Sequence, residues 1–169
     1  MDVFEAIMNR RSIRQYSGER ISDEQVERLL KAAMYAPSAV DKQPWHFIVF
    51  RNMETRKRIV EFHPNASMLT EADTVILVCY DENLQHDEGY GPVDCSAATQ
   101  NILLAAHAMG LGAVWVGIYP RQNRIAATHR LFSLPENIKP FSMISLGYPA
   151  EKKFFPKRFK RERIHYEKW

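Results

Sequence analysis

Cysteine, glycine and proline are scarce in this sequence, and it contains no long apolar run. Of 169 residues, two are cysteines, seven are glycines and nine are prolines, whereas 46% are hydrophobic and 25% are charged. Cys79 and Cys95 do not have Cys-x-x-Cys spacing, so we expect neither a disulfide framework nor a structural zinc site. No stretch approaches the roughly 20 apolar residues of a membrane span, and no basic leader followed by an apolar segment opens the chain. We expect a single globular domain over residues 1–169, located in the cytoplasm.

The sequence also lacks the glycine fingerprint of dinucleotide-binding folds. Gly110-Leu111-Gly112 has two of the three glycines, but it follows a predicted helix, whereas the fingerprint follows a strand. An acidic segment lies between Tyr80 and Pro92 and contains Asp81, Glu82, His86, Asp87 and Glu88. Its spacing matches no known ligand pattern, so we interpret it as a solvated loop and expect no metal site.

Positive charge is concentrated near the C-terminus. The net charge is +3, yet residues 150–169 carry eight Lys/Arg and three Glu, a balance of +5, which leaves −2 for the rest of the chain. This distribution favours a local positive site over a surface coated for nucleic acid. Large aromatic residues are interleaved with these charges: Phe154, Phe155, Phe159, Tyr166 and Trp169. A segment of about 20 residues with little periodicity cannot form its own core, so this tail should lie on another surface, of its own domain or of a second subunit.

A second basic cluster, Arg10-Arg11-Ser12-Ile13-Arg14, follows the first predicted helix. Guanidinium groups present planar sets of N–H donors that match a phosphate, and the serine hydroxyl adds a compact donor. Three or four charge-assisted hydrogen bonds of roughly 1.5–3 kcal/mol each would hold a phosphorylated cofactor. A solvated basic turn is the simpler interpretation of the cluster by itself.

Apolar periodicity predicts helices separated by short strands. Asp2 should cap a helix that starts at Val3, and Ser22 with Gln25 forms a capping box for a helix that must end before Pro37. Further helices are expected over residues 54–63, 93–109 and 121–131, the first of them exposed and basic, and strands over residues 46–50, 74–80, 111–119 and 141–148.

The loop at residues 37–45 is a candidate ligand-contact segment. Two prolines stiffen it, while Ser38, Asp41 and Gln43 offer hydrogen-bonding groups, so it could border a flat polar ring. A plain connecting loop beside a buried Trp45 is the alternative.

Taken in order along the chain, these features resemble the FMN-dependent nitroreductases. The matching segments are Arg10-Arg11-Ser12-x-Arg14, Ala36-Pro37-Ser38-Ala39-x-x-x-Gln43-Pro44-Trp45, Gly110-Leu111-Gly112 leading to Trp115-Val116-Gly117, Ser145-Leu146-Gly147-Tyr148-Pro149, and the tail with Lys157 and Arg158. Each segment is weakly specific, whereas their joint occurrence in this order over nearly the whole chain is strongly specific.

The resemblance implies an α+β fold with a central, mostly antiparallel sheet flanked by helices. It also implies a homodimer in which each C-terminal tail reaches across to the partner, with FMN bound at the interface and NADH or NADPH as reductant. Carried over position by position, the expected cofactor-binding residues are Arg10, Arg11, Ser12, Arg14, Pro37, Ser38, Ala39, Asp41, Gln43, Trp115, Val116, Gly117, Lys157 and Arg158.

The resemblance also assigns roles within this set. The phosphate would be held by Arg10, Ser12 and either Lys157 or Arg158, with Arg11 in support. Arg14 would lie toward the pyrimidine edge of the flavin, residues 37–39 of the other subunit would border one face of the ring, and residues 115–117 would line the opposite side. Asp41 departs from the family, because many members have asparagine there. An ionised aspartate only accepts hydrogen bonds, so if the family's asparagine donates to the flavin there, that contact is lost or the side chain of Asp41 turns away.

The implied activity is hydride transfer from NAD(P)H through FMN to a small acceptor, such as a nitroaromatic or a quinone, in a ping-pong sequence. The flavin supplies the chemistry, so no side chain is expected to be catalytic, and we expect no nucleic-acid or membrane partner. Two alternatives remain at this stage. One is a flavin-holding or flavin-sensing module with little turnover, and the other is a nucleic-acid-binding protein that uses the basic aromatic tail.

Overall fold

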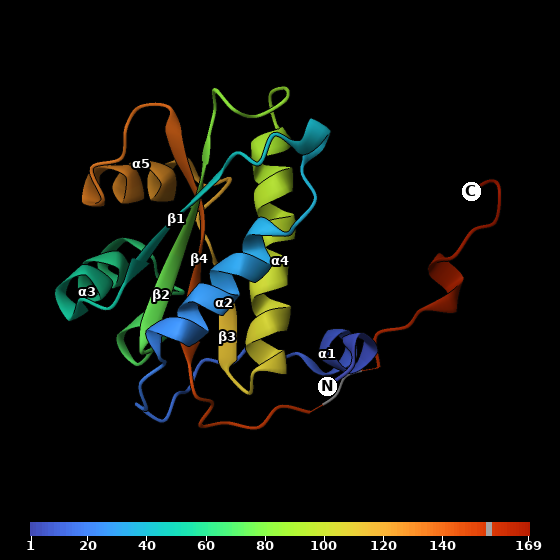
Figure 1. Ribbon diagram of the computed structural model, residues 1–169, viewed down its shortest axis with the longest axis horizontal. Coiled ribbons are helices and arrows are strands. Elements are labelled where there is room, and N and C mark those ends of the chain that lie inside the picture. Colours follow the sequence, from blue (N-terminus) through green and yellow to red (C-terminus); the bar gives the residue numbers. More distant parts are fainter. Residues whose placement is uncertain (155–156) are drawn as a thin grey trace.

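The computed structural model describes residues 1–154 and 157–169. A four-stranded antiparallel sheet with strand order β1-β2-β4-β3 lies at its centre, and helices cover both faces (Figure 1). The strands are β1 (Trp45–Phe50), β2 (Thr74–Asp81), β3 (Gly112–Gly117) and β4 (Ile138–Gly147). The α-helices are α1 (Val3–Asn9), α2 (Asp23–Met34), α3 (Met53–Phe62), α4 (Tyr90–Ala108) and α5 (Gln122–Leu131), and the short 3₁₀ helices are η1 (Ala39–Asp41), η2 (Ser67–Thr70) and η3 (Arg161–Arg163). The predicted α+β class and antiparallel sheet are confirmed.

The two central strands form the most deeply buried part of the sheet. Every side chain of β2 except the last is buried, and β4 pairs along its whole length, with Thr74 opposite Leu146. β4 begins at Ile138, so the predicted start at residue 141 is wrong by three residues. The missed part includes Pro140, which lies opposite Cys79 where the register shifts. A strand tolerates proline at such a bulge, because the N–H that proline lacks is not needed there.

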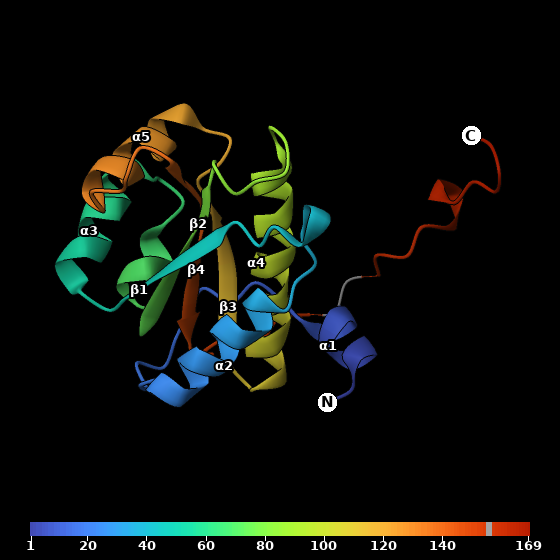
Figure 2. The same ribbon diagram turned by 45° about the horizontal axis from the view of Figure 1, so that its top comes forward.

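Helices α2 and α4 pack on one face of the sheet, and α3 and α5 pack on the other (Figures 1 and 2). Each layer has its own cluster of buried side chains, with Leu29 and Ile102 in the first and Ile59 and Met143 in the second. The sheet therefore lies between two apolar layers, and only its edges are available for polar contacts with a ligand.

The helix predicted over residues 93–109 starts three residues earlier than expected, at Tyr90. Pro92 lies in its first turn, where the N–H that proline lacks would have no partner within the helix. Pro92 therefore belongs to the first turn of α4 and does not lie in front of the helix.

The exposure of α3 differs from the prediction, and α1 exposes an apolar face. The prediction of an exposed basic α3 is wrong in part, because Arg56 and Ile59 are buried. The two terminal nitrogens of the buried Arg56 guanidinium donate to the backbone carbonyls of Leu69, Ala72 and Arg51, which offsets part of the cost of burying this charge. Conversely, α1 leaves its apolar side chains exposed, namely Val3, Phe4, Ile7 and Met8.

The segment after α1 runs beside the edge strand β3. The N–H of Ile13 donates to the carbonyl of Ala113 at 3.0 Å, and Ser12 forms a parallel bridge with Ala113. This approach requires glycine in the strand, because a Cβ on Gly112 would lie 2.7 Å from Cγ2 of Ile13. The arginine cluster is thereby held at the edge of the sheet.

The C-terminal tail passes the N-terminal segment and then extends away from the body, beyond α1 (Figures 1 and 2). The N–H of Ala150 donates to the carbonyl of Gln15 at 2.9 Å where the two segments meet. Exposed aromatic side chains follow, namely Phe154, Phe159, Tyr166 and Trp169, while Phe155 lies outside the described residues. Within residues 1–154 and 157–169, no helix is long and apolar enough to cross a membrane.

Candidate functional site

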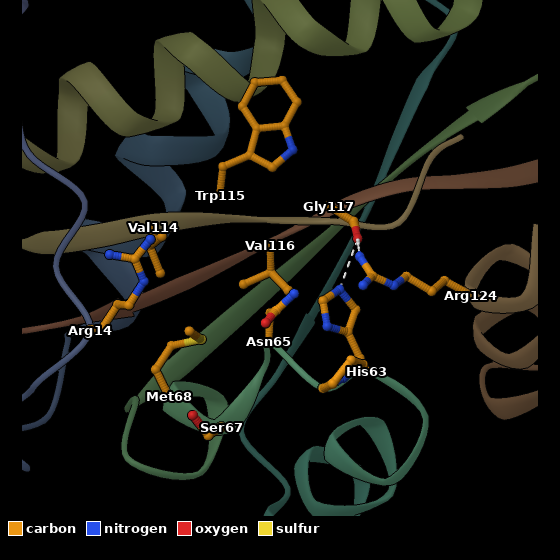
Figure 3. A pocket seen from close by; sticks show the side chains of 11 residues that line it. Arg14, His63, Asn65, Ser67, Met68, Val114, Trp115, Val116, Gly117 and Arg124 are labelled. Atoms are coloured by element: carbon orange, nitrogen blue, oxygen red, sulfur yellow. Dashed lines mark hydrogen bonds between the residues drawn. The ribbon is translucent and has the colours of Figure 1, made fainter. Parts of the chain in front are cut away.

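A cavity of about 510 Å³ lies against the edge of β3 (Figure 3). We call it the β3-edge cavity. It is lined by β3 itself, by the turn after α3, and by one arginine each from the N-terminal segment and from α5. The lining residues are Arg14, His63, Pro64, Asn65, Ser67, Met68, Val114, Trp115, Val116, Gly117 and Arg124. None of these carries a carboxylate, so the cavity is suited to an anionic or electron-rich ligand. The predicted residues Arg14, Trp115, Val116 and Gly117 are all brought together here.

Every second residue of β3 directs its backbone N–H and C=O toward the free edge of the sheet, where the β3-edge cavity lies. In an antiparallel pair, every second residue directs its N–H and C=O away from the neighbouring strand. The carbonyl of Ala113 does so, because it accepts from Ile13. The carbonyl of Gly117 does so as well, because it accepts from two side chains. Trp115 lies midway between them, so its peptide groups face the same edge, where they can bond to a ligand.

Two side chains donate hydrogen bonds to the carbonyl of Gly117. His63 Nε2 lies 2.8 Å from this oxygen and Arg124 Nη1 lies 2.9 Å from it (Figure 3). Burial lowers the pKa of His63 and outweighs the hydrogen bond to the Gly117 carbonyl, which acts to raise it, and the charge of Arg124 lowers the pKa further. A carbonyl oxygen only accepts hydrogen bonds, so His63 carries a hydrogen on Nε2. Burial also lowers the pKa of Arg124, followed by the charge of Arg121.

A second cavity, of about 430 Å³, lies at the arginine cluster, and we call it the cationic cavity. It is lined by Arg11, Ser12, Arg14, Lys153, Phe154 and Arg158. Cationic groups from the two ends of the chain thus meet within one copy of the protein. Arg14 lines both cavities, so the two lie next to each other at this side chain.

Arg11 lines the cationic cavity, whereas the predicted phosphate residue Arg10 lines a neighbouring cavity that it shares with Arg11. Arg11 Nε donates to the carbonyl of Phe154 at 3.1 Å and Arg11 Nη1 donates to that of Met8 at 2.8 Å, so this guanidinium ties the tail to α1. Burial lowers the pKa of Arg10, and the charges of Arg158 and Arg11 lower it further. A bound anion would relieve the mutual repulsion of these guanidinium groups, which fits the predicted phosphate site.

Glu151 fastens the start of the tail to the arginine cluster. Its Oε1 accepts the N–H of Arg14 at 2.7 Å, and its Oε2 is paired with Lys153. Burial acts to raise the pKa of Glu151, but the bonds from Lys153 and from the Arg14 N–H outweigh burial, and the pKa is lowered. The ionised carboxylate therefore holds together the two segments that line the cationic cavity.

The predicted loop at residues 37–43 lines neither of these two cavities. Asp41 Oδ1 accepts from Gln43 Nε2 at 2.8 Å, so this carboxylate is bonded within the loop. The N–H of Ala39 donates to Asp94 Oδ1 at 3.0 Å, which fastens the loop to α4. The role expected for this loop across the ring, from a partner subunit, stays a prediction.

Lys157 is exposed and also lines neither of these two cavities, whereas Arg158 lines the cationic one. The turn after α3 supplies His63 and Asn65 to the β3-edge cavity, and neither residue was predicted from the sequence. The sequence could have indicated this turn only through the short run His63-Pro64-Asn65 between a helix and a strand. Such a run is as typical of an ordinary turn as of a ligand site.

The chain is similar in sequence and in fold to several known proteins. A family model described as the nitroreductase family matches residues 7–65 and 62–148. A relative in Methanothermobacter thermautotrophicus, named "Putative NADH dehydrogenase/NAD(P)H nitroreductase", is 52% identical over 169 residues, which cover 100% of this chain and 88% of the relative. A crystal structure under the same name, from Parabacteroides distasonis, matches with a TM-score of 0.94 at 38% identity and covers 98% of each chain. A "putative nitroreductase in complex with FMN" from Desulfovibrio desulfuricans matches with a TM-score of 0.87 at 32% identity, over 100% of this chain and 98% of that one.

Proposed function

Because this chain belongs to the nitroreductase family, we propose that it is an FMN-dependent oxidoreductase that transfers reducing equivalents from NAD(P)H to a small acceptor. One observation carries the proposal for the site: a cationic cavity and a cavity along a β-edge share the side chain of Arg14. FMN is a phosphate joined to a flat heterocycle by a polar chain, so its two ends match the two cavities.

The cationic cavity would hold the phosphate. The hydroxyl of Ser12 and the guanidinium of Arg158 line it, and Arg10 adds its charge from nearby. Charge-assisted hydrogen bonds of this kind contribute about 1.5–3 kcal/mol each. Of the two tail residues expected at the phosphate, we assign Arg158, because Lys157 does not line the cationic cavity.

The β3-edge cavity would hold the isoalloxazine ring. The pyrimidine side of that ring carries both donors and acceptors, which the outward N–H and C=O of Trp115 and the N–H of Gly117 can meet. The side-chain amide of Asn65 offers a further donor and acceptor. The guanidinium of Arg14 would stabilise negative charge on the reduced ring, an electrostatic role of the oxyanion-hole type.

Bound FMN would supply the redox chemistry, taking hydride from NAD(P)H and delivering it to the acceptor in a ping-pong sequence. The part of the protein is to bind, orient and polarise. No carboxylate lines the β3-edge cavity, and the Nε2–H of His63 is committed to the Gly117 carbonyl. We therefore assign no side chain as general acid, and water would deliver the protons.

A second copy of the chain would complete the site. On α1, Phe4 and Ile7 are exposed, and apolar surface of this kind is commonly covered by association. The tail also extends from the body with Phe159 and Trp169 exposed (Figure 2). In our proposal these surfaces join two copies, and the partner's loop at residues 37–43 covers the open face of the ring. The cytoplasmic location expected from the sequence is part of the same proposal.

The visible spectrum tests the proposed function. Purified protein incubated with FMN and then desalted should retain flavin absorption bands, and anaerobic addition of NADH or NADPH should bleach them. Protein that retains no FMN contradicts the proposal. Bound FMN that neither donor bleaches would favour the flavin-holding module instead. Steady-state rates with each donor over nitroaromatic and quinone acceptors would then identify the preferred pair.

A further inference from the structure

We propose that His63 and Arg124 are positioning residues, which aim the edge of β3 at the flavin by holding the carbonyl of Gly117 between them. The two hydrogen bonds, of 2.8 and 2.9 Å, are present in the structure (Figure 3). We call this arrangement the Gly117 clamp. The inference rests on the proposed function for the identity of the ligand.

The clamp lies at the end of the edge strand β3. Gly117 is the last residue of this strand, and β3 has a neighbouring strand on one side only. A Cβ at this position would meet no atom within 4 Å, so side-chain packing does not fix the peptide. Glycine also has the widest choice of backbone conformations. The peptide that carries this carbonyl has one other backbone hydrogen bond, from the N–H of Ile118 to the carbonyl of Phe141 at 3.3 Å. The two side-chain donors therefore add to a single, longer bond at the end of the strand.

The two donors are anchored in the layer under the sheet. His63 directly follows α3 and is 1% exposed, and Arg124 belongs to α5 and is 9% exposed. Because α3 and α5 pack against the same face, the positions of the two donors are set by the core rather than by solvent. A carbonyl oxygen has two lone pairs, so two donors saturate it and fix its direction.

Fixing this carbonyl also restricts the peptide groups before it, because the strand pairing with β4 leaves Gly117 little room to rotate. The N–H of Gly117 and the peptide groups of Trp115 face the same edge. Donors that are already aligned stabilise developing negative charge without any reorganisation. Loss of the clamp should therefore weaken binding of FMN, and should affect the reduced form more than the oxidised form.

A purely structural role is the competing explanation, in which the two bonds only fasten α3 and α5 to the sheet. That role would change the stability of the fold and leave the properties of bound FMN unchanged. The midpoint potential and the absorption bands of bound FMN therefore separate the two explanations, because both report the surroundings of the ring.

The test uses four variants of the full chain. His63→Leu removes one donor, whereas His63→Gln keeps an N–H at similar reach. Arg124→Met removes the other donor, and Arg130→Met, at an exposed arginine of the same helix, is its matched control. For each protein, the melting temperature without FMN, the Kd for FMN from flavin fluorescence, the absorption bands and the midpoint potential are measured.

We expect His63→Leu and Arg124→Met each to weaken FMN binding at least fivefold, to shift the absorption bands and to make the midpoint potential more negative. His63→Gln and Arg130→Met should stay within twofold of the original chain in Kd. An unchanged potential in both donor-removing variants, or a loss of FMN that only follows loss of folded protein, overturns the inference. If the original chain itself binds no FMN, the proposed function fails and the inference fails with it. If it binds FMN and the variants bind it equally well, the inference alone fails.

Discussion

Removing the guanidinium of Arg158 should weaken binding of FMN and leave binding of riboflavin unchanged. Arg158 lines the cationic cavity together with Ser12 and Arg14, and its side chain is exposed. Water partly screens a bond made at an exposed site, so we take the lower half of the usual range, about 1.5–2 kcal/mol. At about 1.4 kcal/mol for each factor of ten, Arg158→Gln should raise the Kd for FMN roughly 10- to 30-fold.

The assay titrates Arg158→Gln and the original chain with FMN and with riboflavin, following flavin fluorescence. Riboflavin lacks the phosphate, so both proteins should bind it with the same Kd. Arg163→Gln changes another exposed cation of the tail and should leave the Kd for FMN within twofold. Added salt should narrow the difference between the two proteins, because it screens the charge that was removed. An equal loss for FMN and riboflavin, or no loss for either, would refute the placement of the phosphate.

Three further predictions concern stability and assembly. Gly147→Ala should lower the free energy of unfolding in urea by about 1–3 kcal/mol, because its Cβ would lie 2.6 Å from the ring of Tyr16. Gly117→Ala should leave this free energy unchanged, because a Cβ there meets no atom within 4 Å. Equal free energies of unfolding for the two variants would contradict the packing described. The pKa of Glu151 is lowered on folding, so its contribution to stability is present above its ordinary pKa and is lost as pH falls through the folded value. Glu151→Gln should therefore reduce the stability difference between neutral pH and about pH 3, and a pH dependence like that of the original chain would count against this role. The double variant Phe4→Glu, Ile7→Glu should sediment as a monomer, because both side chains are exposed on α1. Lys57→Glu, on the exposed surface of α3, should still sediment as a dimer. A double variant that remains a dimer would argue for a different interface.

Local sequence signals predicted the helix starts well. Asp2 and Ser22 both form complete capping boxes, because a capping box depends on residues only three positions apart. The starts of α4 and β4 were placed three residues late, and the missed residues include Pro92 and Pro140. A first helical turn and a bulge tolerate proline, and the bulge depends on pairing with a distant strand.

The candidate site was predictable where residue types are distinctive. The arginine cluster and the basic tail stand out in the sequence, and the structure brings Ser12 and Arg158 to one cavity. Their meeting depends on the topology, because β4 delivers the tail beside the segment that runs along β3. The resemblance to the nitroreductases supplied what local patterns do not, and membership of that family is confirmed.

The turn after α3 was missed because nothing local distinguishes His63 and Asn65 from the residues of an ordinary turn. Their position at the β3-edge cavity depends on where α3 ends beneath the sheet, which is a property of the packed layers. The loop at residues 37–43 is a different case. Its proposed contact with the ring needs a second copy of the chain, so a single copy leaves the prediction open.

A crystal structure of this protein with FMN would test the central claim most directly. The account predicts one FMN per chain, with its phosphate between Ser12 and Arg158, its ring along the edge of β3 at Trp115 and Gly117, and Arg14 between the two ends. FMN bound with its phosphate away from the arginine cluster, or with its ring away from this edge, would contradict the account.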